Sequence, residues 1–149
     1  MRIFGSILII FLLPLCFAGE VKLLIPPTKA TASPGKKIKV KFYLLNMSLD
    51  SVSAPKKSQL SYQRSTRFYK NVRGKLFEQG GQDGGVSSTV RSSSALAHGE
   101  SREYEIEWEC PKSFDDFDFV GLTLGLFIEG KFVWSTIMIN RSNNDSVPK

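Results

Sequence analysis

The sequence predicts an all-β domain in which two sheets pack as a sandwich of seven or eight antiparallel strands. Two observations carry this prediction. Apolar residues recur at every second position in several segments, which is the period of a strand with one buried face, whereas helical periodicity is nearly absent. Turn residues separate these segments at intervals of about 8–12 residues, a spacing typical of a two-sheet sandwich.

The first part of the chain contains a short strand and then a long one. Residues 21–25 form the short strand, which ends at Pro26-Pro27 because proline lacks the N–H that strand pairing needs. Residues 36–45 follow the turn Ser33-Pro34-Gly35 and alternate without interruption. Lysines occupy one face of this strand, and the other face is apolar, with Ile38, Val40, Phe42 and Leu44.

The middle of the chain predicts weaker strands. Residues 51–54 form a short strand that ends at Pro55, and residues 59–67 and 68–77 form two more. Residues 79–88 are predicted to be a flexible loop, because the glycine-rich composition of this stretch disfavours a strand. Residues 90–96 add one edge strand.

The last part of the chain has the clearest pattern. Residues 103–109 place glutamates on one face and apolar residues on the other. Residues 119–128 and 132–140 form a β-hairpin, in which Gly121 and Gly125 thin the face opposite the leucines. From these patterns we expect the core to contain Val40, Phe42, Ile106, Trp108, Leu122 and Leu124.

The N-terminal segment predicts export. Arg2 precedes an apolar run over residues 7–13, which is much shorter than the ~20 residues of a membrane-spanning helix. Small residues then lead to a cleavage point after Ala18. An alternative is a lipoprotein beginning at Cys16, although Leu15 stands where a lipobox has a small residue. We expect a signal peptide (1–18), a β-sandwich domain (19–140), a flexible polar tail (141–149), no transmembrane segment in the mature chain, and a secreted or periplasmic location.

Cleavage leaves Cys110 as the single cysteine, so an internal disulfide is excluded. We expect this residue to be buried at the end of a strand, with pairing between chains as the alternative. Three Asn-x-Ser triplets begin at Asn46, Asn140 and Asn144. They are glycan acceptors in a eukaryotic secretory pathway and carry no such meaning in a bacterium.

Charge is distributed unevenly along the chain, whose formal net charge is +6. Residues 20–75 carry thirteen basic and two acidic residues, whereas residues 76–149 carry six basic and twelve acidic residues. One interpretation is a basic half that attracts a polyanion or a membrane surface. The other is that the two halves neutralise each other within the fold.

A cross-strand ladder is the form of neutralisation that we expect. If residues 36–45 and 102–110 are antiparallel neighbours in one sheet, their charged side chains share its outer face. Such a pair contributes roughly 0.2–1 kcal/mol. The predicted members are Lys37, Lys39, Lys41, Glu103, Glu105 and Glu107.

Another basic group has no acidic neighbours in the sequence. No acid occurs between residues 51 and 77, and Tyr62, Phe68 and Tyr69 lie among the bases. Basic groups with stacking rings favour an anionic polysaccharide, or less favourably a single-stranded nucleic acid. The alternative is that these charges protect an edge strand from aggregation. The candidate polyanion-binding residues are Lys56, Lys57, Arg64, Arg67, Lys70, Arg73 and Lys75.

Catalytic and metal-binding patterns are weak. His98 is the single histidine, and no nucleophile motif accompanies it. One histidine and one mature cysteine do not make a zinc site. Asp115, Asp116 and Asp118 offer oxygen ligands for calcium, but the phenylalanines between them favour a loop held by aromatic packing. We therefore expect no enzyme activity, no metal and no cofactor.

Two segments carry a resemblance to known domains. Residues 32–35 (Ala-Ser-Pro-Gly) precede the first long strand, and residues 96–100 (Leu-Ala-His-Gly-Glu) precede the strand that contains Trp108. This order resembles exported bacterial immunoglobulin-like or fibronectin-III-like domains over nearly the whole mature chain. The second segment also resembles bacterial proteinase-inhibitor domains of the BsuPI kind. The chain lacks the paired cysteines of an antibody-type domain.

The predicted function is that of an exported, non-catalytic, immunoglobulin-like binding or interaction module. Its partner would be a protein or an anionic polysaccharide. The resemblance implies a secreted proteinase inhibitor as one alternative. A structural or assembly subunit that adds a strand to a partner sheet is another.

Overall fold

The computed structural model describes residues 20–88 and 92–143. The predicted signal peptide, Asn144 and most of the predicted tail lie outside the described residues. The described residues form β1 (Val21–Leu24), β2 (Lys37–Asn46), β3 (Val52–Pro55), β4 (Tyr62–Val72), β5 (Lys75–Val86), β6 (Ser93–Leu96), β7 (Ser101–Glu109), β8 (Phe119–Ile128) and β9 (Lys131–Asn140). A 3-10 turn, η1 (Lys57–Gln59), precedes β4.

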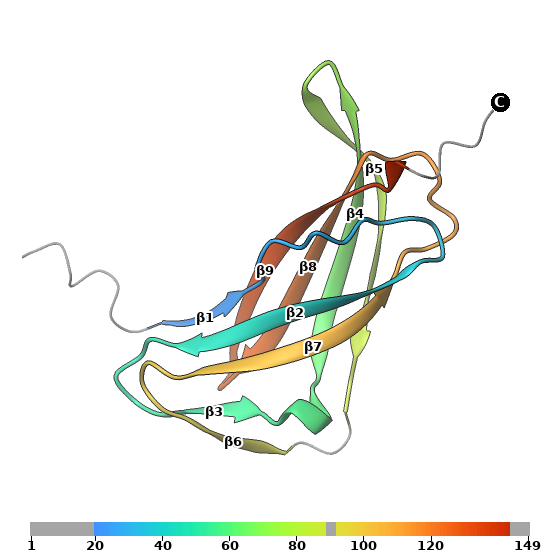
Figure 1. Ribbon diagram of the computed structural model, residues 1–149. Coiled ribbons are helices and arrows are strands. Elements are labelled where there is room, and N and C mark those ends of the chain that lie inside the picture. The colour runs from blue at the N-terminus through green and yellow to red at the C-terminus, as the bar shows by residue number, and fades with distance from the viewer. Residues whose placement is uncertain (1–19, 89–91, 144–149) are drawn as a thin grey trace, which may run out of the picture.

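The fold is an all-β sandwich, as the sequence predicts, and it is built from antiparallel sheets (Figure 1). One sheet has the order β1-β2-β7 and the other has the order β5-β4-β8-β9. The short pair β3-β6 lies at one end of the sandwich, and the β4–β5 hairpin projects beyond the other end. The described residues contain nine strands, where the sequence predicts seven or eight.

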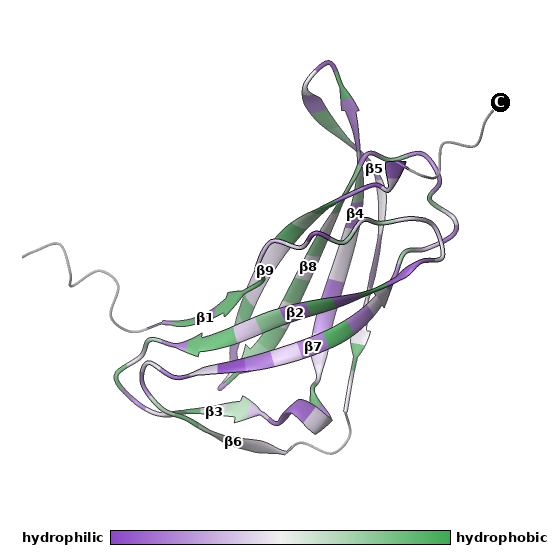
Figure 2. Cartoon of the chain, in the orientation of Figure 1, coloured by the Kyte–Doolittle hydropathy of each residue, from purple (hydrophilic) through white to green (hydrophobic). Residues whose placement is uncertain are grey.

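The core lies between the two sheets and contains all six predicted core residues. Trp108 and Ile106 enter it from β7, and Leu122 and Leu124 enter it from β8. Side chains of alternating hydropathy give β2 its striped pattern in Figure 2. This alternation is what packs one face of the strand and leaves the other in water.

The predicted lysine–glutamate ladder is confirmed. β2 and β7 are antiparallel neighbours, with Lys39 opposite Glu107 and Lys41 opposite Glu105. The ion pairs run diagonally across the outer face, at N···O distances of 2.9, 3.4 and 3.6 Å for Lys37–Glu107, Lys39–Glu105 and Lys41–Glu103. The charges on this sheet face are therefore compensated within the sheet.

Hydrogen bonds from side chains of β7 attach the β3-β6 pair to the β1-β2-β7 sheet. The Arg102 guanidinium donates to the backbone oxygens of Ala54 and Ala95, at 3.0 and 3.1 Å. The Tyr104 hydroxyl donates to the backbone oxygen of Pro55 at 2.7 Å. These bonds satisfy carbonyl groups at the sheet edge that strand pairing leaves open.

The predictions for the middle of the chain are wrong at two points. Residues 62–72 form one continuous strand, β4, whereas the sequence predicts two strands that meet between residues 67 and 68. The turn between β4 and β5 lies at Arg73-Gly74. Residues 79–86, predicted to be a flexible loop, belong to β5. The backbone of an edge strand can pair without side chains, so glycine does not prevent strand formation when β4 supplies the partners.

Glycine is in fact required at two positions of β5. A Cβ atom at Gly85 would lie 2.4 Å from the backbone oxygen of Tyr62, and one at Gly81 would lie 2.5 Å from that of Thr66. Real Cβ atoms do not approach backbone oxygens so closely. The glycine-rich sequence of β5 therefore fits its close pairing with β4.

Two further expectations concern buried residues. Cys110 is fully buried immediately after β7, as predicted. Asn46 is also fully buried, and its amide donates to the backbone oxygens of Asp50 and Leu96 at 2.8 and 2.9 Å. This side chain is inaccessible to a glycan, whereas Asn140 is exposed. Over residues 20–88 and 92–143, no helix has the length and apolarity to cross a membrane.

Candidate binding surface on the four-stranded sheet

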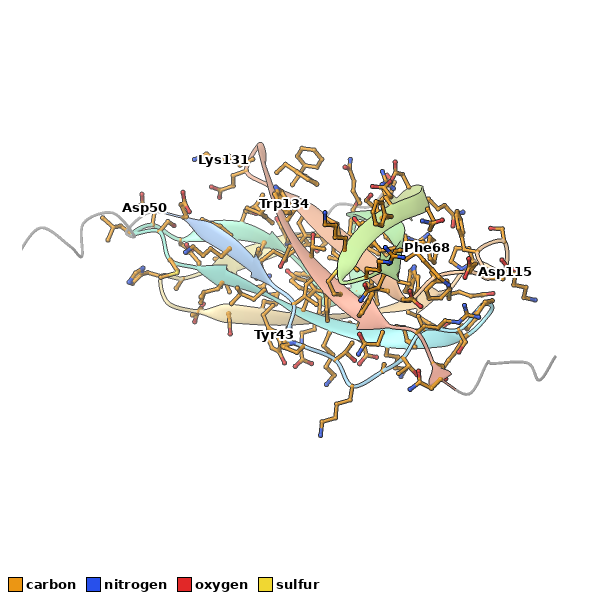
Figure 3. The ribbon with its side chains drawn as sticks, turned by 90° about the horizontal axis from the view of Figure 1, so that it is seen from above. Tyr43, Asp50, Phe68, Asp115, Lys131 and Trp134 are labelled. Carbon is orange, nitrogen blue, oxygen red and sulfur yellow. The ribbon has the colours of Figure 1, made fainter. Side chains whose placement is uncertain are left out.

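The outer face of the β5-β4-β8-β9 sheet exposes large aromatic side chains at one end. Phe127 on β8 and Phe132 and Trp134 on β9 have exposed fractions of 60%, 42% and 61%. We call these three residues the aromatic ridge. In Figure 3, Trp134 and Lys131 lie on one side of the sandwich and Tyr43, from the ladder face, lies on the other.

The β8–β9 turn sets the arrangement of the ridge. Glu129 and Gly130 both have positive φ, 48° and 80°, which is the backbone of a two-residue hairpin turn that matches the strand twist. This turn places Ile128 opposite Lys131 and Phe127 opposite Phe132. The two phenylalanine rings meet with their centroids 5.0 Å apart.

Gly125 provides the space beneath the ridge. It lies on the outward face, opposite Trp134 on β9. A Cβ atom at this position would lie 2.1 Å from Cζ of Phe132. The Phe132 ring therefore packs directly on the backbone of β8, in the space that a side chain at position 125 would occupy.

Two hollows adjoin the ridge. The larger, about 830 Å³, lies between the end of the four-stranded sheet and the β3-β6 pair, and we call it the serine groove. Its lining residues are Ser53, Pro55, Gln59, Ser61, Tyr62, Gln63, Gly85, Val86, Ser87, Ser92, Ser93, Gly125, Phe127, Glu129 and Gly130. The smaller, about 660 Å³, lies beside β1 and includes Phe132 and Trp134; we call it the β1-side groove.

The polar atoms of the serine groove are partly satisfied within the protein. The Glu129 carboxylate accepts a hydrogen bond from the backbone N–H of Ser53 at 2.7 Å. The Ser53 hydroxyl donates to that of Ser93 at 2.7 Å. Oε1 of Gln59 is buried and has no hydrogen-bond partner among the described residues. A buried acceptor of this kind is destabilising unless a donor reaches it.

The seven predicted polyanion-binding residues do not converge on one face. Lys56 and Lys57 lie at η1, near the β3-β6 pair, whereas Arg73 and Lys75 lie at the tip of the projecting hairpin (Figure 1). Within β4, Arg64 is opposite the buried Leu124 and faces inward along the edge of the sandwich. The structure therefore spreads this group from η1, along β4, to the tip of the hairpin.

Acidic residues from distant segments neutralise two of the seven. Arg67, on the outward face of β4, donates to Oδ1 of Asp83 at 2.7 Å. This bond, and a second from Ser65, lower the pKa of Asp83 below its usual value. Lys70 forms an ion pair with Asp116, which lowers the pKa of that carboxyl in the same way. Although no acidic residue lies near these two bases in the sequence, the fold brings one next to each of them.

The loop between β7 and β8, which contains Asp115, Asp116 and Asp118, is held by aromatic packing, as predicted from the sequence. The ring of Phe68 stacks on Phe114 at 4.1 Å between centroids and meets Phe117 edge-on at 5.1 Å. Asp118 accepts the backbone N–H of Asn71 at 2.8 Å. The described residues contain no cluster of three or more His, Cys, Asp or Glu side chains suited to a metal ion.

His98 lies in the exposed turn between β6 and β7, and its Nδ1 is 2.7 Å from the backbone oxygen of Ser48. In the same turn, the Glu100 carboxylate accepts the backbone N–H of Ala97 at 2.8 Å. The segment that carries the BsuPI resemblance thus contacts both its own turn and the loop that follows β2. Its implied inhibitory function stays a prediction.

The sequence pattern does not predict the aromatic ridge. Residues 132–139 are apolar or small at both strand phases, so alternation does not show which phase faces the core. The apolar character of both strand faces is nevertheless a usable signal. A strand at the surface of a sandwich buries only one face, so a strand that is apolar on both faces exposes apolar side chains to water.

Comparisons with known proteins support the fold. No protein-family model matches the chain, and no curated protein matches it. Among solved structures, the chain is similar to Spo0M, a sporulation control protein from Bacillus subtilis, with a TM-score of 0.54 and 16% sequence identity. The similarity covers 83% of this chain and 50% of that chain, so the chain spans about half the length of Spo0M. At this identity the similarity shows a shared β-rich fold alone.

Proposed function

We propose that this protein is an exported, non-catalytic binding module that contacts its partner through the aromatic ridge and the adjoining grooves. The observation that carries this proposal is the exposure of Phe127, Phe132 and Trp134 side by side on one sheet face. Contiguous exposed aromatic groups are unfavourable in water and mark interaction sites when they are rimmed by polar residues. The N-terminal sequence supports export, and the β2–β7 pairing supports an immunoglobulin-like arrangement.

The test compares two faces of the same domain. The mature domain, a Phe127→Ser/Trp134→Ser variant and a Lys39→Gln/Glu105→Gln variant are immobilised and exposed to the extracellular fraction of the source cells. We expect a component that the parent and the ladder variant retain and the ridge variant releases. Circular dichroism and thermal unfolding of each variant check that the fold is kept.

Retention by the ridge variant and loss by the ladder variant would place binding on the wrong face for this proposal. Retention of nothing by any of the three proteins would contradict it altogether. Turnover of a hydrolase substrate that His98→Ala abolishes would contradict the non-catalytic assignment. The N-terminal residue of the exported protein, determined by mass spectrometry, tests cleavage after Ala18.

A second candidate is an assembly subunit that acts by strand addition. β5 is the edge strand of its sheet, and its twelve residues are almost all exposed. An unpaired strand edge of this length is a template for a partner strand. Hydrogen exchange tests this: a bound partner strand would slow exchange of the outward-facing amides of residues 75–86, and unchanged exchange in the complex would exclude strand addition at this edge.

A further inference from the structure

The serine groove combines the two kinds of surface that a sugar presents to a protein. A pyranose ring has apolar C–H faces and a rim of hydroxyl groups that both donate and accept hydrogen bonds. In the groove, Phe127 and Tyr62 supply aromatic surface. The groove therefore offers two aromatic side chains among mainly polar ones.

Hydrogen-bonding groups line the same hollow. Five serine hydroxyls and the amides of Gln59 and Gln63 border it. The serine hydroxyls can also accept hydrogen bonds from a ligand. The Glu129 carboxylate, already anchored by the Ser53 N–H, offers a further acceptor. These groups match a polyhydroxylated ligand better than an apolar one.

The charge of the lining decides between a neutral and an anionic ligand. Among the described residues that line the serine groove, Glu129 is the one ionisable group that is charged at neutral pH, and no lysine or arginine is present. An anionic polysaccharide would place negative charge near this carboxylate without a cation to compensate it. The described lining of the serine groove therefore favours an uncharged ligand over the polyanion predicted from sequence.

We propose that the serine groove and the aromatic ridge bind a neutral carbohydrate chain. This inference rests on the proposed function and names its ligand class. One sugar unit occupies the serine groove against Phe127 and Tyr62, with the Glu129 carboxylate accepting a hydrogen bond. The chain then crosses the ridge towards Trp134, which lines the β1-side groove.

The two tryptophans make the binding measurable without a label. The chain contains two, of which Trp108 is buried at 1% exposure and Trp134 is exposed at 61%. Cellohexaose, xylohexaose and chitohexaose are the neutral probes, and a heparin hexasaccharide is the anionic comparison. We expect at least one neutral probe to shift the Trp134 emission to shorter wavelength and to protect it from acrylamide quenching.

Calorimetric titration of variants then locates the site. Phe127→Ala removes the ring, and we expect it to weaken binding of that neutral probe about tenfold, equivalent to ~1.4 kcal/mol. Leu76→Ala is the matched control, because Leu76 is exposed at 51% near the tip of the β4–β5 hairpin, away from both grooves. It should leave affinity within about twofold.

Three outcomes would overturn the carbohydrate assignment: no binding of any neutral probe at millimolar concentration, tighter binding of heparin than of the neutral probes, or equal affinities for the Phe127→Ala and Leu76→Ala variants. The capture experiment separates this failure from that of the proposed function. If the ridge variant still loses a component that the parent retains, the binding face stands and the ligand class is wrong.

Discussion

The two outer faces of this sandwich are built in opposite ways. On the β1-β2-β7 sheet, Lys37, Lys39 and Lys41 are each paired with a glutamate of β7, so the face is charged and compensated. On the β8–β9 end of the other sheet, Phe127 and Trp134 expose more than half of their surface. Paired charges are typical of a sheet face in contact with water, whereas exposed aromatic side chains are typical of an interaction surface.

This difference shows which part of the charge pattern is structural. The ladder accounts for three of the basic residues in the first half, and Asp83 and Asp116 account for two more. Ion pairs therefore compensate these five of the thirteen basic residues of the first half. Phe127 and Trp134 of the aromatic ridge stay exposed despite the Phe127–Phe132 contact, which is why we place the proposed binding function there.

The largest expected effect separates the two tryptophans. Trp108→Ala empties a fully packed core position and should destabilise the domain by about 3–5 kcal/mol. Trp134→Ala removes an exposed ring and should change the free energy of unfolding by less than ~0.5 kcal/mol. Urea unfolding of both variants measures this, and comparable losses of stability would show that Trp134 is a packing residue.

A smaller effect is expected at the glycine beneath the ridge. Gly125→Ala places a Cβ atom where the Phe132 ring now lies, so the ring must move and its contact with Phe127 is lost. An aromatic pair of this kind contributes about 0.5–1.5 kcal/mol. Thermal unfolding and ligand titration should both report the change.

Gly84→Ala is the control for that substitution. Its Cβ atom would lie 3.2 Å from Nη2 of Arg64, the end of a flexible side chain that can move aside. We expect a change in stability within ~0.5 kcal/mol and no change in ligand affinity. If Gly84→Ala weakened ligand binding as much as Gly125→Ala, the ridge geometry would not be the cause.

The ladder face should respond to acid. The hydroxyl of Tyr43 and the charge of Lys41 lower the pKa of Glu103 below its ordinary value of 4.5. A carboxyl whose pKa is lower in the folded state stabilises the fold above its unfolded pKa, and this contribution is lost as pH falls through the folded pKa. The melting temperature should therefore decrease when the pH is lowered below about 4.5.

Calorimetry of the parent and of Glu103→Gln between neutral and acidic pH checks this expectation. The variant lacks the titrating group, so its melting temperature should decline less steeply over the acidic range. Parallel declines for the two proteins would show that the Tyr43–Glu103 contact does not contribute to the pH dependence.

The smallest effect is expected for polyanion binding. The four changes Arg64→Gln, Arg67→Gln, Lys70→Gln and Arg73→Gln test the group predicted from sequence. Because Arg67 and Lys70 are ion-paired and the others are scattered, we expect the parent and this variant to elute from heparin at similarly low salt. Late elution of the parent and early elution of the variant would restore these residues as a polyanion site.

Alternation identified the parts of the fold in which one strand face is buried and the other is charged. Residues 36–45 and 103–109 are such segments, and their pairing, their ladder and their core residues follow from that pattern. β5 escaped prediction because its glycines carry no pattern and its stability depends on pairing with β4. The ridge escaped prediction because β9 has apolar residues on both faces, and the choice of inward face is made by tertiary packing.

The most direct test of the central claim is an NMR titration of the ¹⁵N-labelled mature domain with cellohexaose, xylohexaose and chitohexaose in turn. The Trp134 indole and the backbone amides of residues 59–63 and 125–132 report on the ridge and the serine groove, and those of residues 37–41 and 103–107 report on the ladder. Our account predicts saturable shifts in the first set with at least one probe, while the second set stays unchanged. Shifts confined to the ladder residues, or none with any probe, would contradict it.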